Sequence, residues 1–127
     1  MTFGLLLAAG LLVLALGFVH SLLGELLFLR HMQSFQGFPS LPGCEGFWQG
    51  TLRVTWHVPS ILALALAAML IDFALLPGLG GGERFVVKVI ALAQWLCAAL
   101  TLAGTKGRHP AWAAFAMGGV LCWLATA

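Results

Sequence analysis

The chain contains four long apolar stretches, which are separated by segments rich in polar residues, glycine or proline. A helix needs roughly 20 apolar residues to cross the hydrocarbon core of a bilayer. The pattern therefore predicts an all-α membrane protein, a single domain over residues 1–127 built as a bundle of four transmembrane helices. The expected helices cover approximately residues 2–29, 52–76, 84–105 and 111–125, with a long loop over residues 30–51.

The composition supports a membrane location and excludes several classes of protein. Hydrophobic residues make up 61% of the chain and charged residues only 8%, with a mean hydropathy of +1.03, so an ordinary soluble domain is excluded. The net charge of +2 comes from scattered basic residues, which argues against nucleic acid as a partner. The expected partner is the lipid bilayer.

Four spans place both termini on the same side of the membrane. More cations lie on the side of the membrane opposite the termini than on the side of the termini. The opposite side has Arg30, Arg53, Lys106 and Arg108, and the side of the termini has Arg84 and Lys88. Positive residues favour the cytoplasmic side. We therefore expect a bacterial inner-membrane protein with the loop over residues 30–51 in the cytoplasm.

Ionisable residues interrupt the first apolar stretch near its end, in the segment FVHSLLGELLFLR, which carries His20, Ser21 and Glu25. A charge at the centre of a bilayer costs about 2.5–3.5 kcal/mol or more, so such residues usually face protein or a cavity. Three glycines share a helical stripe with His20, namely Gly10, Gly17 and Gly24. Because small residues allow another helix to approach closely, this stripe predicts that His20 lies inside the bundle.

The second helix opens with RVTWHVPS, which places Arg53, His57 and Ser60 on one face. Arg108 and His109 follow the third helix on the same side of the membrane, so we expect one polar pocket there. At about 1.5 Å per residue, His20 and His57 lie at the same depth only if Glu25, rather than Arg30, marks the membrane surface.

The leading hypothesis for this pocket is a ligated redox centre for electron transfer. Histidines from neighbouring helices can hold haem b from both faces, and cations near the rim can pair with its propionates. The cofactor-binding residues would be His20, His57, Arg53 and Arg108. A single transition metal ion is a variant, and its ligands would be His20, His57, Glu25 and His109.

Three other classes remain open. Imidazole titrates near neutrality, so the pocket is also compatible with a proton-coupled or small-anion transporter, which would need an oligomer because four spans leave little room for a path. The same residues suit a structural hydrogen-bonded network in an accessory subunit of a larger membrane complex. An enzyme acting on lipid or quinone is the third possibility, for which the sequence assigns no catalytic residue.

Three segments, HSLLGE at 20–25, RVTWH at 53–57 and GRHPAW at 107–112, together give the chain a family resemblance. It resembles a group of small, uncharacterised bacterial four-helix membrane proteins. The resemblance implies that the three segments form one site, and it implies no activity.

Overall fold

The computed structural model describes residues 1–32 and 46–127, and all regular structure in those residues is helical. This confirms the prediction of an all-α chain. The elements, in chain order, are α1 (Thr2–Leu23), the π-helical segment η1 (Gly24–Leu29), α2 (Arg30–Met32), α3 (Phe47–Leu75), α4 (Gly81–Thr105) and α5 (Ala111–Ala125).

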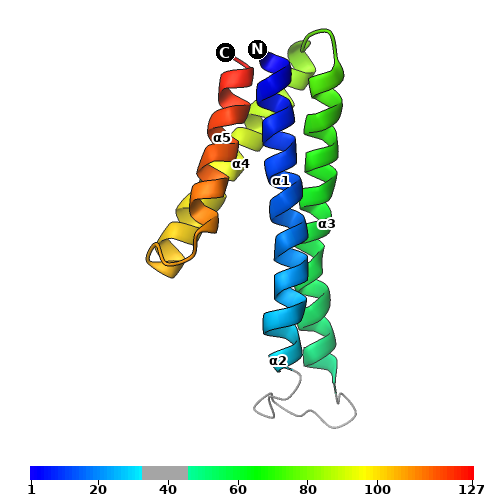
Figure 1. Cartoon of the computed structure of the whole chain (residues 1–127), viewed down its shortest axis with the longest axis vertical. Coiled ribbons are helices and arrows are strands. Elements are labelled where there is room, and N and C mark those ends of the chain that lie inside the picture. Colours follow the sequence, from blue (N-terminus) through cyan, green and yellow to red (C-terminus); the bar gives the residue numbers. More distant parts are fainter. Residues whose placement is uncertain (33–45) are drawn as a thin grey trace.

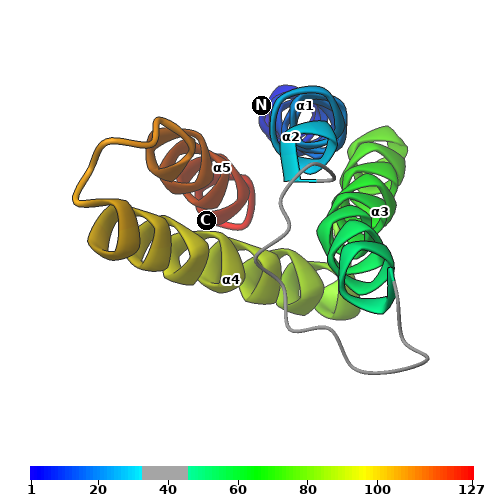
Figure 2. The ribbon, with the colours of Figure 1, turned by 90° about the horizontal axis from the view of Figure 1, so that it is seen from below.

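The helices form two antiparallel pairs, α1 with α3 and α4 with α5 (Figure 1). Helix α1 also packs against α5, which joins the pairs. The N and C termini lie at the same end of the molecule, and the pairs diverge toward the other end (Figures 1 and 2). The turn between α4 and α5 is therefore well separated from the far end of α1 and α3.

Two helices begin earlier than the sequence pattern indicates. Helix α3 starts at Phe47 instead of near residue 52, and α4 starts at Gly81 instead of near residue 84. Apolar periodicity marks where a helix enters lipid, whereas hydrogen bonds in the chain decide where it begins, for example the bond from Arg84 N to Gly80 O at 3.1 Å. Most of the expected loop, residues 33–45, lies outside the described residues.

Three stretches are long and apolar enough to cross a membrane: Thr2–Met32, Phe47–Leu75 and Gly81–Thr105. Helix α5 is apolar but has only 15 residues, about 22 Å at 1.5 Å per residue, less than the ~30 Å of a typical hydrocarbon core. The chain thus has the helices of an integral membrane protein, with a shorter fourth helix.

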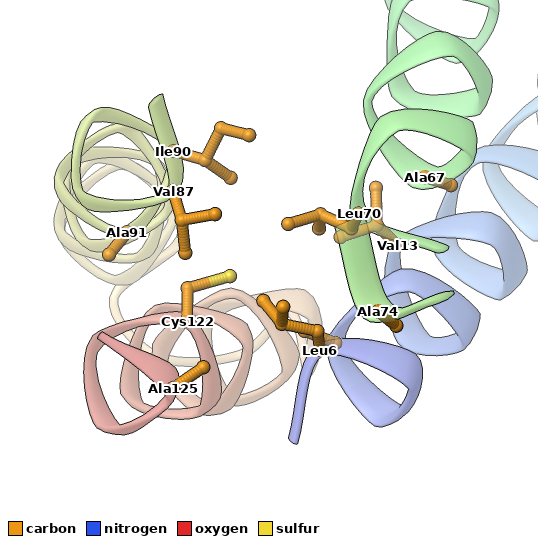
Figure 3. Packing of buried hydrophobic residues seen from close by; sticks show 11 residues of the cluster. Leu6, Val13, Ala67, Leu70, Ala74, Val87, Ile90, Ala91, Cys122 and Ala125 are labelled. Carbon is orange, nitrogen blue, oxygen red and sulfur yellow. The ribbon is translucent and has the colours of Figure 1, made fainter. Parts of the chain in front are cut away.

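The main cluster of buried hydrophobic residues lies in the half of the molecule near the termini. Each of α1, α3, α4 and α5 contributes one large, fully buried side chain, and Figure 3 shows these side chains converging: Leu6, Leu70, Val87 and Cys122. Along α1, the core cluster extends only as far as Val13. Beyond Val13, α1 packs mainly against α3. The polar residues lie in this part of the helix pair.

Glycines set the close contact between α1 and α3. A Cβ atom added to Gly10 would lie 3.2 Å from the backbone oxygen of Ala67, and one added to Gly17 would lie 3.2 Å from that of Ser60. The seven-residue step from Gly10 to Gly17 along α1 is thus matched by the seven-residue step backward from Ala67 to Ser60 along α3. The predicted glycine stripe is where α3 approaches α1.

A second pair of glycines, Gly118 and Gly119, brings α4 close to α5 within the same chain. We expect Gly119→Ala to lower the free energy of unfolding by roughly 1–3 kcal/mol, as overpacking does, because the new methyl group would overlap the ring of Trp95 and lie 3.0 Å from Ala91 O. SDS titration in mixed micelles measures this. Gly104→Ala is the control, since nothing lies within 4 Å of its added Cβ; equal losses in both variants would contradict the expectation.

Candidate functional site

An ion pair joins α3 to the π-helical segment that follows α1. Arg53 contacts the Glu25 carboxylate through two nitrogens, with Nη2 2.5 Å from Oε1 and Nε 3.2 Å from Oε2. Two parallel N–H···O bonds of this kind fix the orientation of both groups. Glu25 therefore lies at the same level along the helix pair as Arg53. This is the register in which Glu25, rather than Arg30, lies beside the start of the polar face of α3.

His57 lies one turn further along α3, and its two ring nitrogens contact α1 and η1. Its Nδ1 is 2.8 Å from Ser21 Oγ, and its Nε2 is 3.4 Å from Glu25 Oε2. A carboxylate only accepts hydrogen bonds, so Nε2–H donates to Glu25 and, in the neutral ring, Nδ1 accepts the hydroxyl proton of Ser21. The result is a continuous chain of hydrogen bonds, Ser21–His57–Glu25–Arg53, hereafter the polar network.

Helix geometry explains why these four side chains meet. Ser21 and Glu25 are four residues apart, as are Arg53 and His57, so each pair projects from one face on consecutive turns. The antiparallel packing of α1 and α3 places the two rows opposite each other. The relative exposed areas of the side chains are 27% for Glu25, 31% for His57 and 44% for Arg53, so the network is open to the surface on one side.

His20 has a different environment from the one expected. It is exposed rather than inside the bundle, and its ring stacks on Trp56 with centroids 4.7 Å apart and an angle of 5° between the planes. Trp56 also donates a hydrogen bond from Nε1 to His20 O at 3.2 Å. Trp56 and His57 are consecutive in α3 and point in different directions, so His20 and His57 contact different groups.

Protein-family models, curated proteins and solved structures were compared with the chain. None matches it. The geometry of the polar network is thus the basis for any functional assignment.

The structure does not gather the four expected metal ligands, His20, Glu25, His57 and His109. Among residues 1–32 and 46–127, no group of three or more His, Cys, Asp or Glu side chains could hold a metal ion. His109 belongs to the turn between α4 and α5, where its Nδ1 accepts a hydrogen bond from Ala111 N at 3.2 Å. Its own backbone N–H donates to Thr105 Oγ1 at 3.3 Å, so His109 links the two helices.

The expected haem site also lacks the predicted convergence. Of its four residues, Arg53 and His57 lie in the polar network and His20 lies beside it. Arg108 is in the turn between α4 and α5, which Figure 1 shows away from the far end of α1 and α3. Both nitrogens of His57 already have partners, so binding iron would require one hydrogen bond to break. Haem ligation remains a prediction that this arrangement favours less.

Ser60 shares the expected face of α3 but stays outside the polar network. Its hydroxyl is buried, and it has no hydrogen-bond partner among the residues the structure describes. Its backbone faces Gly17 of α1. Ser60 therefore belongs to the close helix contact and not to the exposed chain of hydrogen bonds.

Two site residues had no distinct role in the sequence prediction. Trp56 stands in the segment RVTWH without a role of its own, and Gly24 is one of the three glycines that share a stripe with His20. The antiparallel register of α1 and α3 is the signal that points to these two residues. With Gly10 opposite Ala67 and Gly17 opposite Ser60, Gly24 lies opposite the first turns of α3. The bulky side chain that lies across from Gly24 in those turns is Trp56.

Proposed function

We propose that this chain is an integral membrane protein that transfers protons at one membrane face through the polar network. The observation that supports the proposal is the double hydrogen bonding of His57, to a hydroxyl through Nδ1 and to a carboxylate through Nε2. Imidazole is the side chain whose charge changes near neutral pH. Ionisable residues within membrane-spanning segments commonly form proton relays.

The transfer step follows from these contacts. A proton delivered through Ser21 Oγ binds His57 Nδ1, and the proton on Nε2 then passes to Glu25 Oε2. Glu25, whose side chain is 27% exposed, then releases the proton to water. Rotation of the His57 ring restores its first tautomer, so the cycle needs no oxidant or reductant. Arg53 neutralises the ionised form of Glu25 and keeps the carboxylate in place between turnovers.

In the proposed membrane arrangement, α5 completes a fourth span and both termini lie on one side. We infer from the positive-inside bias that the network end and the loop over residues 30–51 lie on the cytoplasmic side of a bacterial inner membrane. Four helices enclose little space, so the path beyond the network would be formed with further copies of the chain or within a larger complex.

We expect liposomes containing the purified protein and a trapped pH-sensitive dye to equilibrate an imposed pH gradient faster than empty liposomes do. His57→Gln should remove most of the difference, because an amide cannot take up a proton near neutral pH. Equal rates for protein-containing and empty liposomes would contradict the proposal. A Soret band in the purified protein that His20→Ala abolishes would favour the haem hypothesis instead.

A further inference from the structure

The indole of Trp56 contacts two rings of the first helical stretch. The His20 ring stacks on the indole, and the centroid of the Phe28 ring lies 4.9 Å from that of the indole, with an angle of 27° between the planes. The indole N–H donates to His20 O at 3.2 Å. Trp56 thus contacts residues two turns apart on that stretch, so its position depends on the register of that stretch against α3.

Gly24 provides the space for this ring. A Cβ atom on Gly24 would overlap the indole at Nε1 and its neighbouring carbons, so only glycine admits Trp56 here. Unlike Gly10 and Gly17, which face backbone oxygens, Gly24 faces an aromatic side chain. The first stretch also changes from α-helix to π-helix at Gly24, and π-helical turns often occur at functional sites.

The two residues of this contact are direct neighbours of the polar network in the chain. Gly24 precedes Glu25, and Trp56 precedes His57. The Trp56–Gly24 contact therefore fixes the two backbones at the point where Glu25 and His57 must meet. A hydrogen bond of 3.4 Å between Nε2 and Oε2 is already long, so a small shift of either backbone breaks it.

We propose that Trp56, seated on Gly24, is a positioning residue that sets the register of the first helical stretch against α3 and keeps Glu25 within reach of His57. Trp56 takes no proton itself. The part of this inference that concerns proton transfer rests on the proposed function, whereas the part that concerns register does not.

The register is tested by the distance between spin labels on the two helices. Leu27→Cys and Val54→Cys place labels at sites that are 70% and 64% exposed. The background is a chain in which Cys44 and Cys97 are replaced by alanine and Cys122, which is fully buried in the core, is kept. Trp56→Leu and Gly24→Ala should each shift the distance distribution by an ångström or more. Gly4→Ala is the matched control, because nothing lies within 4 Å of its added Cβ. Unchanged distances in both variants would overturn the inference.

Proton transfer gives a second readout in the same variants. Misplacement by about 1 Å can slow a reaction on the order of a hundredfold, so Trp56→Leu and Gly24→Ala should slow transfer 10- to 100-fold per folded molecule, and Trp56→Phe, which keeps a ring without the N–H donor, should slow it less. The variant that combines Trp56→Leu with Gly24→Ala should transfer protons no more slowly than Trp56→Leu alone, because both changes act on one contact. A rate loss equal to the product of the two single losses would overturn the inference.

These readouts separate the two proposals. If the unaltered protein moves no protons, the proposed function fails, and the spin-label distances still decide whether Trp56 sets the register. If the unaltered protein moves protons but Trp56→Leu changes neither distance nor rate, the positioning role fails and the proposed function stands.

Discussion

Glu25→Gln is expected to abolish proton transfer by the reconstituted protein. In the proposed transfer step Glu25 accepts the proton from His57 Nε2, and its carboxylate also accepts hydrogen bonds from two nitrogens of Arg53. An amide of nearly the same shape cannot take up a proton in the neutral range, and it leaves the Arg53 guanidinium without its counter-ion. Decay of an imposed pH gradient in liposomes measures the loss.

Asp72→Asn is the matched control for this change. Asp72 is an exposed carboxylate near the other end of α3, so its loss changes the net charge equally without touching the polar network. Glu25→Asp should retain part of the rate, since it keeps the carboxylate but shortens its reach. Full activity of Glu25→Gln, or an equal loss in Asp72→Asn, would contradict the assignment of Glu25 as proton acceptor.

The second large effect is expected from Gly17→Leu, which should separate α1 from α3. The first added carbon already lies 3.1 Å from Ala63 Cβ and 3.2 Å from Ser60 O. A backbone oxygen cannot move aside without the whole of α3 moving. We expect a loss of about 3 kcal/mol in the free energy of unfolding, the upper end for overpacking, measured by SDS titration, together with loss of proton transfer.

Ala15→Leu is the control for Gly17→Leu. Ala15 is exposed on the same helix, so a leucine there enlarges a lipid-facing position and leaves the contact with α3 intact. We expect its unfolding free energy to stay within about 0.5 kcal/mol of the original, as for most surface substitutions. A similar loss at both positions would show that bulk anywhere on α1, and not the close contact, is the cause.

Apolar patterning predicted the helical class and the long helices well, because the bilayer imposes that pattern directly. It placed the starts of α3 and α4 too late, since both helices begin in polar or glycine-rich residues where lipid imposes no pattern. The arrangement of the pairs could not be predicted this way. Side chains such as Leu6 and Cys122 hold the pairs together only near the termini, and a hydropathy pattern carries no information about which helices diverge.

Part of the candidate site was predictable, because residues four apart on a helix share a face. This placed Ser21 with Glu25 and Arg53 with His57, and the structure brings both rows together. The expected inclusion of His109 assumed that helix ends on one membrane side converge, which the divergence of the α4–α5 pair prevents. His20 was placed inside because it shares the glycine stripe, but the space beside Gly24 is filled by Trp56.

All members of the polar network come from the first helical pair. Ser21, Glu25, Arg53 and His57 precede α4 in the chain, and they need no hydrogen bond from α4 or α5 to meet. As the nascent protein leaves the ribosome, the first two spans can therefore be inserted with their ionisable groups already neutralising one another. These ionisable groups therefore have their hydrogen-bond partners in the membrane before the second half of the protein is synthesised.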